Sequence, residues 1–197
     1  MTERGQNRLR IIGGEWRGRK LSFPALSELR PTPDRVRETL FNWLHNILPG
    51  ARCLDLFAGS GALAFEALSR GAEEVVMIDQ HPAVVAQLKK HVEQLKARNA
   101  RVVQAETLVF LRGLPRTFDI VFLDPPYKGE LLGSCMAQLA ARDWLAPTAW
   151  LYIETDRRTP LPPLPADWTI LRHKEAGQVG YYLLQRTSAD RSPGEPV

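Results

Sequence analysis

Short apolar strands alternate with helical patterns between residues 51 and 153, and this alternation restricts the fold more than any other feature of the sequence. The predicted strands span residues 53–57, 74–79, 101–104, 118–123 and 149–153, and predicted helices lie between them at 61–70, 82–98, 108–111 and 129–142. Such alternation predicts a parallel sheet covered on both faces by helices. Strands 168–171 and 179–184 then follow one another without a helix, which predicts an antiparallel hairpin at the sheet edge.

The first 23 residues form a separate segment in the sequence. Two short stretches, 9–12 and 19–21, flank a glycine-rich turn and predict a β-hairpin. A helix is expected over 35–48, with Asp34 as its cap. The predicted organisation is a basic hairpin or arm at 1–23, a main domain at 24–187 and a disordered polar tail at 188–197.

The positive charge of the chain is concentrated at its N-terminus. Residues 1–20 contain six basic and two acidic residues, a net charge of +4. This equals the net charge of the whole chain of 197 residues. A basic arm on a neutral body favours a polyanionic partner, and nucleic acid is the first candidate. A solvated tail is the alternative, but Trp16 and several glycines lie between the charges, which favours RNA contact. The candidate RNA-binding residues of the arm are Arg10, Trp16, Arg17, Arg19 and Lys20.

The remaining composition excludes several classes of protein. The two cysteines, Cys53 and Cys135, give neither a disulfide framework nor metal-ligand spacing, which indicates a reducing compartment. No apolar run is long enough to cross a membrane, and the polar N-terminus lacks the apolar core of a signal peptide. We therefore expect a cytoplasmic protein.

A glycine turn joins the first predicted strand to the following helix. Gly59 and Gly61 allow the chain to turn tightly and to approach a ligand closely. Asp79 ends the next strand, where a carboxylate can accept both ribose hydroxyls of an adenosine. The alternative for Asp79 is a helix cap, and one side chain can do both.

Two cofactors fit a glycine turn followed by an acid. A dinucleotide site usually shows G-x-G-x-x-G, but the third glycine is replaced here by Ala64. Asp55 precedes the turn, where a carboxylate would repel a pyrophosphate and attract an ammonium group. The charges therefore favour S-adenosylmethionine, which carries an ammonium and a sulfonium, over NAD.

The segment Asp124-Pro125-Pro126-Tyr127 directly follows the apolar strand 118–123. Proline has no N–H group and fixes φ, and the residue before a proline is held extended. The backbone carbonyls are therefore free to accept hydrogen bonds beside the Asp124 carboxylate. These features suit a planar ring that carries an NH₂ group and stacks on Tyr127, although Tyr127 could instead fill the core.

These motifs resemble a known family. The glycine turn, Asp79 and the segment 124–127, in this order and spacing, are similar to class I S-adenosylmethionine-dependent amino-methyltransferases. Residues 10–21 and 30–42 further resemble the RsmD family of bacterial 16S rRNA guanine-N2 methyltransferases, which modify guanine 966 of the RNA. The resemblance implies an α/β, Rossmann-like, seven-stranded and mostly parallel sheet with an antiparallel C-terminal edge strand, plus a small N-terminal β-hairpin.

The resemblance also implies an activity and the residues that perform it. The activity would be methyl transfer to the N2 amine of a guanine in 16S rRNA, on the small ribosomal subunit or its assembly intermediate. The cofactor would be S-adenosyl-L-methionine, with S-adenosyl-L-homocysteine as product and no metal; neither a membrane nor an obligate protein partner is implied. The implied catalytic residues are Asp124, Pro125, Pro126 and Tyr127. The implied cofactor-binding residues are Thr32, Asp55, Phe57, Gly59, Gly61, Asp79 and Glu106, and Arg35 and Arg37 join the RNA-binding set.

Other functions are compatible with part of the pattern. A DNA adenine-N6 or a protein glutamine methyltransferase would keep the chemistry, but no target-recognition insertion is visible in the sequence. An RNA-binding module without catalysis is disfavoured by the intact segment 124–127, and an NAD-dependent oxidoreductase by the missing third glycine.

Overall fold

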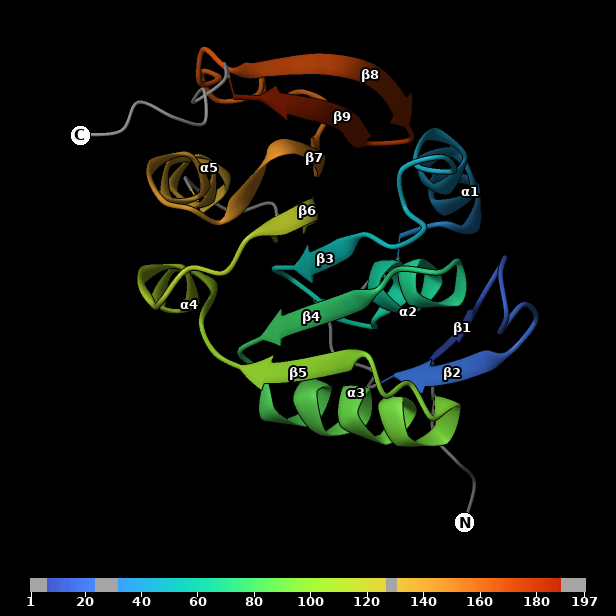
Figure 1. Ribbon diagram of the computed structural model, residues 1–197. Coiled ribbons are helices and arrows are strands. Elements are labelled where there is room, and N and C mark those ends of the chain that lie inside the picture. The colour runs from blue at the N-terminus through green and yellow to red at the C-terminus, as the bar shows by residue number, and fades with distance from the viewer. Residues whose placement is uncertain (1–6, 24–31, 127–130, 189–197) are drawn as a thin grey trace.

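The computed structural model describes residues 7–23, 32–126 and 131–188. Its main sheet contains the strands β3 (Arg52–Asp55), β4 (Glu74–Asp79), β5 (Ala100–Gln104), β6 (Phe118–Leu123), β7 (Leu145–Asp156), β8 (Trp168–Ala176) and β9 (Val179–Thr187). Their order across the sheet is β5-β4-β3-β6-β7-β9-β8 (Figure 1). The first five of these strands pair in parallel, whereas β9 pairs antiparallel with both β7 and β8. The predicted α/β class, the parallel sheet and the antiparallel hairpin at its edge are confirmed.

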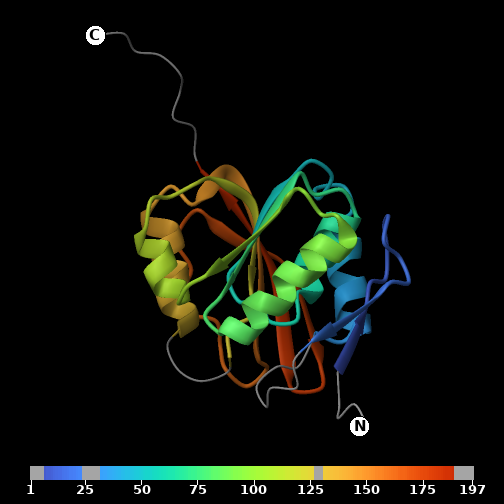
Figure 2. The same ribbon diagram turned by 90° about the horizontal axis from the view of Figure 1, so that it is seen from below.

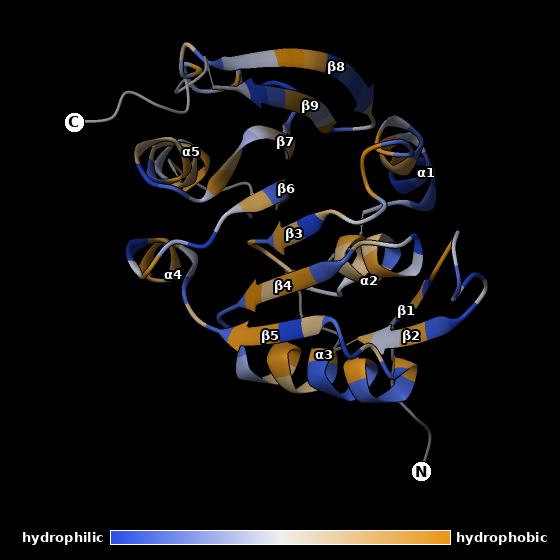
Figure 3. Ribbon diagram, viewed as in Figure 1, coloured by the Kyte–Doolittle hydropathy of each residue, from blue (hydrophilic) through white to orange (hydrophobic). Residues whose placement is uncertain are grey.

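Helices cover both faces of the sheet. The helices α1 (Asp34–Trp43), α2 (Ala62–Ser69) and α3 (Pro82–Leu95) lie on one face, and α4 (Thr107–Arg112) and α5 (Leu131–Ala141) lie on the other (Figures 1 and 2). Successive strand residues point to opposite faces, so Phe122 belongs to the α1–α3 core and Leu123 to the α4–α5 core. Polar and apolar stretches alternate along α3, as expected for a helix with one face on the sheet (Figure 3).

The N-terminal hairpin consists of β1 (Asn7–Arg10) and β2 (Lys20–Phe23), paired antiparallel. Its apolar side chains Leu9, Ile11 and Trp16 are buried and belong to the same hydrophobic core as α1–α3. The hairpin is therefore packed onto the α/β unit through a shared core.

A buried carboxylate of α2 also holds the hairpin. Glu66 is fully buried, and its two oxygens accept hydrogen bonds from the backbone N–H groups of Ile12 (2.9 Å) and Gly13 (2.8 Å). The Ser69 hydroxyl donates to the Gly13 carbonyl at 2.6 Å and accepts from the Trp16 N–H at 2.9 Å. Four hydrogen bonds to side chains of one helix therefore fix the turn of the hairpin.

Some predicted boundaries were wrong. Helix α1 ends at Trp43 rather than at residue 48, and residues 44–47 form turns. The N-cap position is occupied by Pro33, so Asp34 lies in the first turn and does not cap the helix. Strand β7 extends beyond 149–153 at both ends because it pairs with β9 along nine positions. That pairing also places β9 inside the sheet and β8 at its edge.

Candidate functional site

The turn between β3 and α2 depends on two glycines with left-handed backbone. Gly59 has φ of 50° and Gly61 has φ of 78°. A Cβ on Gly61 would lie 2.5 Å from the Phe65 ring and 2.8 Å from a Leu88 methyl group. No L-residue with a side chain fits this position without displacing the core. The turn therefore brings bare backbone and the N-terminus of α2 to the carboxyl edge of the sheet.

Asp55, the last residue of β3, is a buried carboxylate beside this turn. It is 2% exposed and accepts a hydrogen bond from the Phe57 N–H at 3.3 Å. Burial raises the pKa of Asp55 to about 7, and the negative charge of Asp79 adds to this rise. Hydrogen bonds from the Phe57 and Ala64 N–H groups lower the pKa and so oppose the rise. No ion pair to Asp55 exists among the described residues. A cationic group of a ligand would therefore find an unmatched negative charge here.

Asp79 and Glu106 stand at the ends of the two neighbouring strands. The Asp79 carboxylate accepts from the Gly59 N–H at 3.0 Å and from the His81 N–H at 2.8 Å. The cap of α3 is His81 itself, whose Nδ1 accepts from Ala83, so Asp79 supports the turn rather than capping the helix. Glu106 caps α4 by accepting from the N–H groups of residues 108 and 109. Both carboxylates keep further lone pairs for a ligand.

The segment after β6 lies beside this site. Asp124 is half-buried, Pro125 is buried and Pro126 is exposed, whereas Tyr127 lies outside the described residues. The pKa of Asp124 is raised well above its ordinary value, first by burial and then by the charges of Glu154 and Asp55. A cavity of about 330 Å³ opens here, and its lining includes both prolines and Glu154.

Glu154 was not predicted from the sequence. It is 2% exposed, accepts a hydrogen bond from the Tyr152 hydroxyl at 2.7 Å and is hydrogen bonded to the Thr32 side chain. It lies near the end of β7, directly after a buried apolar run, much as Asp55 and Asp79 end their strands and Asp124 follows β6. This position, an acid at the carboxyl end of a strand, was the signal that could have identified it.

The predicted site residues therefore fall into two groups. The structure gathers Asp55, Phe57, Gly59, Gly61, Asp79 and Glu106 along the ends and following turns of β3, β4 and β5. Thr32 is buried and is a neighbour of Glu154.

The predicted RNA-binding residues separate by exposure. Arg10, Arg17, Arg19, Lys20 and Arg35 are exposed. Trp16 is only 7% exposed and packs in the core, which leaves little of its side chain for the predicted RNA contact. Arg37 is 1% exposed; its guanidinium donates to the Thr32 and Arg10 carbonyls and to Asp34. This side chain joins the hairpin to α1 and is not at the surface, so its burial does not support the predicted RNA contact of Arg37.

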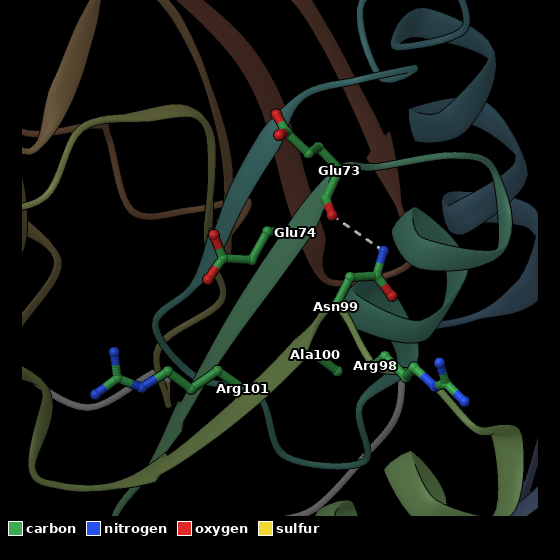
Figure 4. Close-up of a pocket in the computed structure, with 6 residues that line it drawn as sticks. All are labelled: Glu73, Glu74, Arg98, Asn99, Ala100 and Arg101. Atoms are coloured by element: carbon green, nitrogen blue, oxygen red, sulfur yellow. Dashed lines mark hydrogen bonds between the residues drawn. The ribbon is translucent and has the colours of Figure 1, made fainter.

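A second cavity, of about 270 Å³, lies at the opposite end of the sheet. Its lining residues are Glu73, Glu74, Arg98, Asn99, Ala100 and Arg101, at the starts of β4 and β5 (Figure 4). The Asn99 amide donates to the Glu73 carbonyl at 3.1 Å, which ties this corner together. In parallel sheets ligands bind at the carboxyl ends of the strands, so this cavity is not the candidate site.

Within residues 7–23, 32–126 and 131–188, no group of three or more His, Cys, Asp or Glu side chains could hold a metal ion. No helix in the same part of the chain is long and apolar enough to cross a membrane.

Comparison with known proteins places the chain in a family. A sequence model of the family described as Conserved hypothetical protein 95 matches residues 9–185. The chain is 48% identical over 191 residues to Ribosomal RNA small subunit methyltransferase D of Escherichia coli strain K12, covering 97% of this chain and 96% of that protein. The Haemophilus influenzae protein of the same name is 44% identical and covers 93% of this chain and 97% of its own length. The solved structure of the Escherichia coli protein yhhF superposes with a TM-score of 0.86 at 49% identity, covering 93% of this chain and 100% of that one. The resemblance drawn from the motifs is confirmed: this chain belongs to the Conserved hypothetical protein 95 family, the RsmD family of ribosomal RNA small subunit methyltransferases.

Proposed function

We propose that this protein transfers a methyl group from S-adenosylmethionine to the exocyclic N2 amine of a guanine in 16S rRNA, on the small ribosomal subunit or an assembly intermediate. One observation carries the proposal. The Asp124-Pro125-Pro126 segment ends β6 beside a cavity of about 330 Å³, next to the strand ends that carry the glycine turn and Asp79. A donor site and an amine site therefore adjoin at one edge of the sheet.

The residues of the glycine turn fit a cationic nucleoside cofactor. The left-handed backbone at Gly59 and Gly61 turns the chain tightly at the strand end, where the amino acid part of the cofactor would lie, and a Cβ at Gly61 would displace the core. Asp55 offers a buried carboxylate without a cation for the ammonium group. Asp79 offers its remaining lone pairs to the ribose hydroxyls, and Glu106 offers its own to the adenine amine. When bound, the cofactor supplies an electrophilic methyl group.

The Asp124 segment would orient the target amine. An amine on an aromatic base is a poor nucleophile, because its lone pair is delocalised into the ring. Hydrogen bonds from its two N–H groups to the Asp124 carboxylate and the Pro125 carbonyl would fix the nitrogen and direct the lone pair at the methyl group.

A covalent intermediate on the protein is not part of the proposal. Both cysteines are buried, and burial raises the pKa of Cys135 to about 12 and that of Cys53 further. The thiolates that a nucleophilic role requires are therefore disfavoured.

The hairpin would bind the phosphate backbone of the RNA. Its exposed cations are Arg10, Arg17, Arg19 and Lys20, and Arg35 lies at the start of α1. Because the hairpin shares the core of the α/β unit, these charges are held at a fixed position relative to the site. Phosphate contacts of this kind set register and orientation rather than sequence preference.

The activity is tested with naked 16S rRNA and with small subunits that lack the modification, by primer extension and by transfer of labelled methyl. Asp124→Ala should abolish transfer and leave cofactor affinity nearly unchanged in calorimetry. The matched control is Asp143→Ala, an exposed aspartate in the turn before β7. Lost cofactor affinity with retained turnover in Asp124→Ala would contradict the assignment of the two sites.

The RNA surface is tested by charge removal, because deleting residues 1–20 would expose the core that Leu9, Ile11 and Trp16 help to form. The double variant Arg17→Gln/Arg19→Gln should weaken RNA binding and reduce its salt slope by about 1.4 to 1.8. Arg98→Gln/Arg101→Gln removes the same charge at the opposite cavity (Figure 4) and should leave the slope unchanged. Equal slopes for the two double variants would exclude the hairpin from the RNA interface.

A further inference from the structure

Two carboxylates, Asp124 just after β6 and Glu154 near the end of β7, lie at the same level of the sheet. Strands β6 and β7 are parallel, with Leu123 opposite Ile153, so Asp124 and Glu154 follow at equivalent positions. Phe122 and Tyr152, two residues earlier, both point into the α1–α3 core. Since side chains two residues apart share a face, Asp124 and Glu154 extend the same row.

Glu154 is fixed in place. It is 2% exposed and bonded to the Tyr152 hydroxyl on its own strand and to the Thr32 side chain before α1. Two hydrogen bonds from different segments leave this carboxylate little freedom. A glutamate at the surface would be solvated by water and would need no such hydrogen bonds. The two bonds to Glu154 therefore indicate that its carboxylate is held at one position.

No cation in the described part of the chain pairs with either carboxylate. Arg37 contacts the Thr32 carbonyl, but its guanidinium is directed to Asp34, Glu66 and the Arg10 carbonyl. Burial of an unpaired charge is costly. We therefore expect the two carboxylates of Asp124 and Glu154 either to keep a proton or to meet a positively charged group during the reaction.

The other titratable groups near the pair do not supply that cation. Asp55 at the end of β3 is a third carboxylate, and Tyr152 and Tyr181 approach from β7 and β9. Burial raises the pKa of Glu154, and its hydrogen bonds to Tyr152 and Thr32 oppose the rise. Burial raises the pKa of Asp124, and the charges of Glu154 and Asp55 raise it further. The field at Asp124 thus increases its affinity for a proton.

We propose that Glu154 is a positioning residue whose charge makes Asp124 the acceptor of the proton that the target amine loses on methylation. The proposal rests on the proposed function. The nitrogen lone pair forms the N–C bond to the methyl group, the C–S bond breaks and its electron pair stays on sulfur. The nitrogen then carries a positive charge, one N–H bond breaks, and the proton passes to the Asp124 carboxylate. The products are a neutral N-methyl amine, a neutral thioether and a protonated Asp124.

The test is the pH profile of the single-turnover rate with saturating cofactor and RNA. In the wild type the rate should fall on the acid side, with a midpoint at the raised pKa of Asp124. In Glu154→Gln, which keeps the shape of the side chain and removes its charge, the midpoint should move down by about one to two pH units. The plateau rate should also decrease, because the ionised Asp124 becomes a weaker base.

Two further variants separate this role from a structural one. Glu154→Asp keeps the charge and should restore a midpoint close to that of the wild type. Glu175→Gln removes an exposed carboxylate on β8. Lys174 lies in register with Tyr181 and Glu154, so the next residue, Glu175, points to the other face of the sheet from Glu154. This variant should leave the pH profile unchanged. A purely structural role would lower the rate of Glu154→Gln equally at every pH. An unchanged midpoint in Glu154→Gln, or the same shift in Glu154→Asp, overturns the proposal.

A measurement without RNA keeps the inference independent of the substrate. Carboxyl ¹³C NMR of aspartate-labelled protein, assigned with Asp124→Asn, follows the ionisation of Asp124 directly. Titration of Asp124 in the ordinary aspartate range overturns the proposal, even if Glu154→Gln fails to fold. A wild-type protein that methylates no RNA but shows a raised Asp124 titration would instead contradict the proposed function alone.

Discussion

Replacing Glu66 by alanine should detach the hairpin turn from α2 and destabilise the whole domain. The Glu66 carboxylate accepts from the Ile12 and Gly13 N–H groups and from Arg70 Nε at 2.8 Å, and it lies 3.5 Å from Arg37 Nη1. Arg37 is 1% exposed, and its Nη1 has no hydrogen bond in the structure. Removal of Glu66 would leave this buried guanidinium with Asp34 as its remaining carboxylate partner.

The expected magnitude follows from these contacts. Breaking a buried ion pair by removing one partner costs about 3–5 kcal/mol, because the other charge stays buried. Backbone N–H groups that lose their acceptor add to this cost, but the hairpin turn is only partly buried, so water replaces some of the lost bonds. We therefore expect a loss of about 3–5 kcal/mol in the free energy of unfolding.

Urea unfolding followed by circular dichroism measures this loss. The control is Glu38→Ala, an exposed glutamate on α1 that forms no ion pair within the described part of the chain, which should change stability by no more than about 0.5 kcal/mol. A loss below about 1 kcal/mol in Glu66→Ala would refute the reasoning, because it would show that the hairpin and the two arginines do not depend on this carboxylate.

Three further predictions concern the cofactor side of the site. Asp79→Ala should weaken cofactor binding by about 1.5–3 kcal/mol in calorimetry, and unchanged affinity would reduce Asp79 to a support of the glycine turn. Because the pKa of Asp55 is about 7 and only its ionised form attracts an ammonium group, cofactor affinity should rise between pH 6 and pH 8. Asp55→Asn should remove this pH dependence. A cofactor affinity of the wild type that does not change with pH would contradict the role of Asp55 as the partner of the ammonium group. Gly61→Ala should lower the melting temperature more than Gly50→Ala, because both glycines have positive φ but a Cβ meets the core only at Gly61. Equal losses in the two glycine variants would show that the contact with the core is unimportant.

Much of the site could be predicted because its signals are local. Asp55, Asp79 and Asp124 each follow an apolar strand, and parallel strands end at the same edge of a sheet. The glycines of the turn have a left-handed backbone, which favours glycine through local geometry alone. Periodicity and turn chemistry therefore sufficed for the fold class and for the edge at which the site lies.

The role of the N-terminal residues could not be predicted in the same way. The charged N-terminal stretch suggested RNA contact for Trp16, and the family resemblance suggested it for Arg37, but both side chains are buried. Both contact residues of α2 far away in the sequence: the Trp16 N–H donates to the Ser69 hydroxyl, and Arg37 lies 3.5 Å from Glu66. Composition shows where charges are concentrated, but it does not show which of them have partners elsewhere in the chain.

The sequence alone thus determined the α/β class, the glycine turn and the strand-end acids, because these depend on patterns within single elements and on how parallel strands end. Only the tertiary structure decided that the hairpin shares the core, which of its side chains face solvent, and that Glu154 stands beside Asp124. These features arise from the packing of segments far apart in the chain, where burial and charge are set by neighbours that no local pattern records.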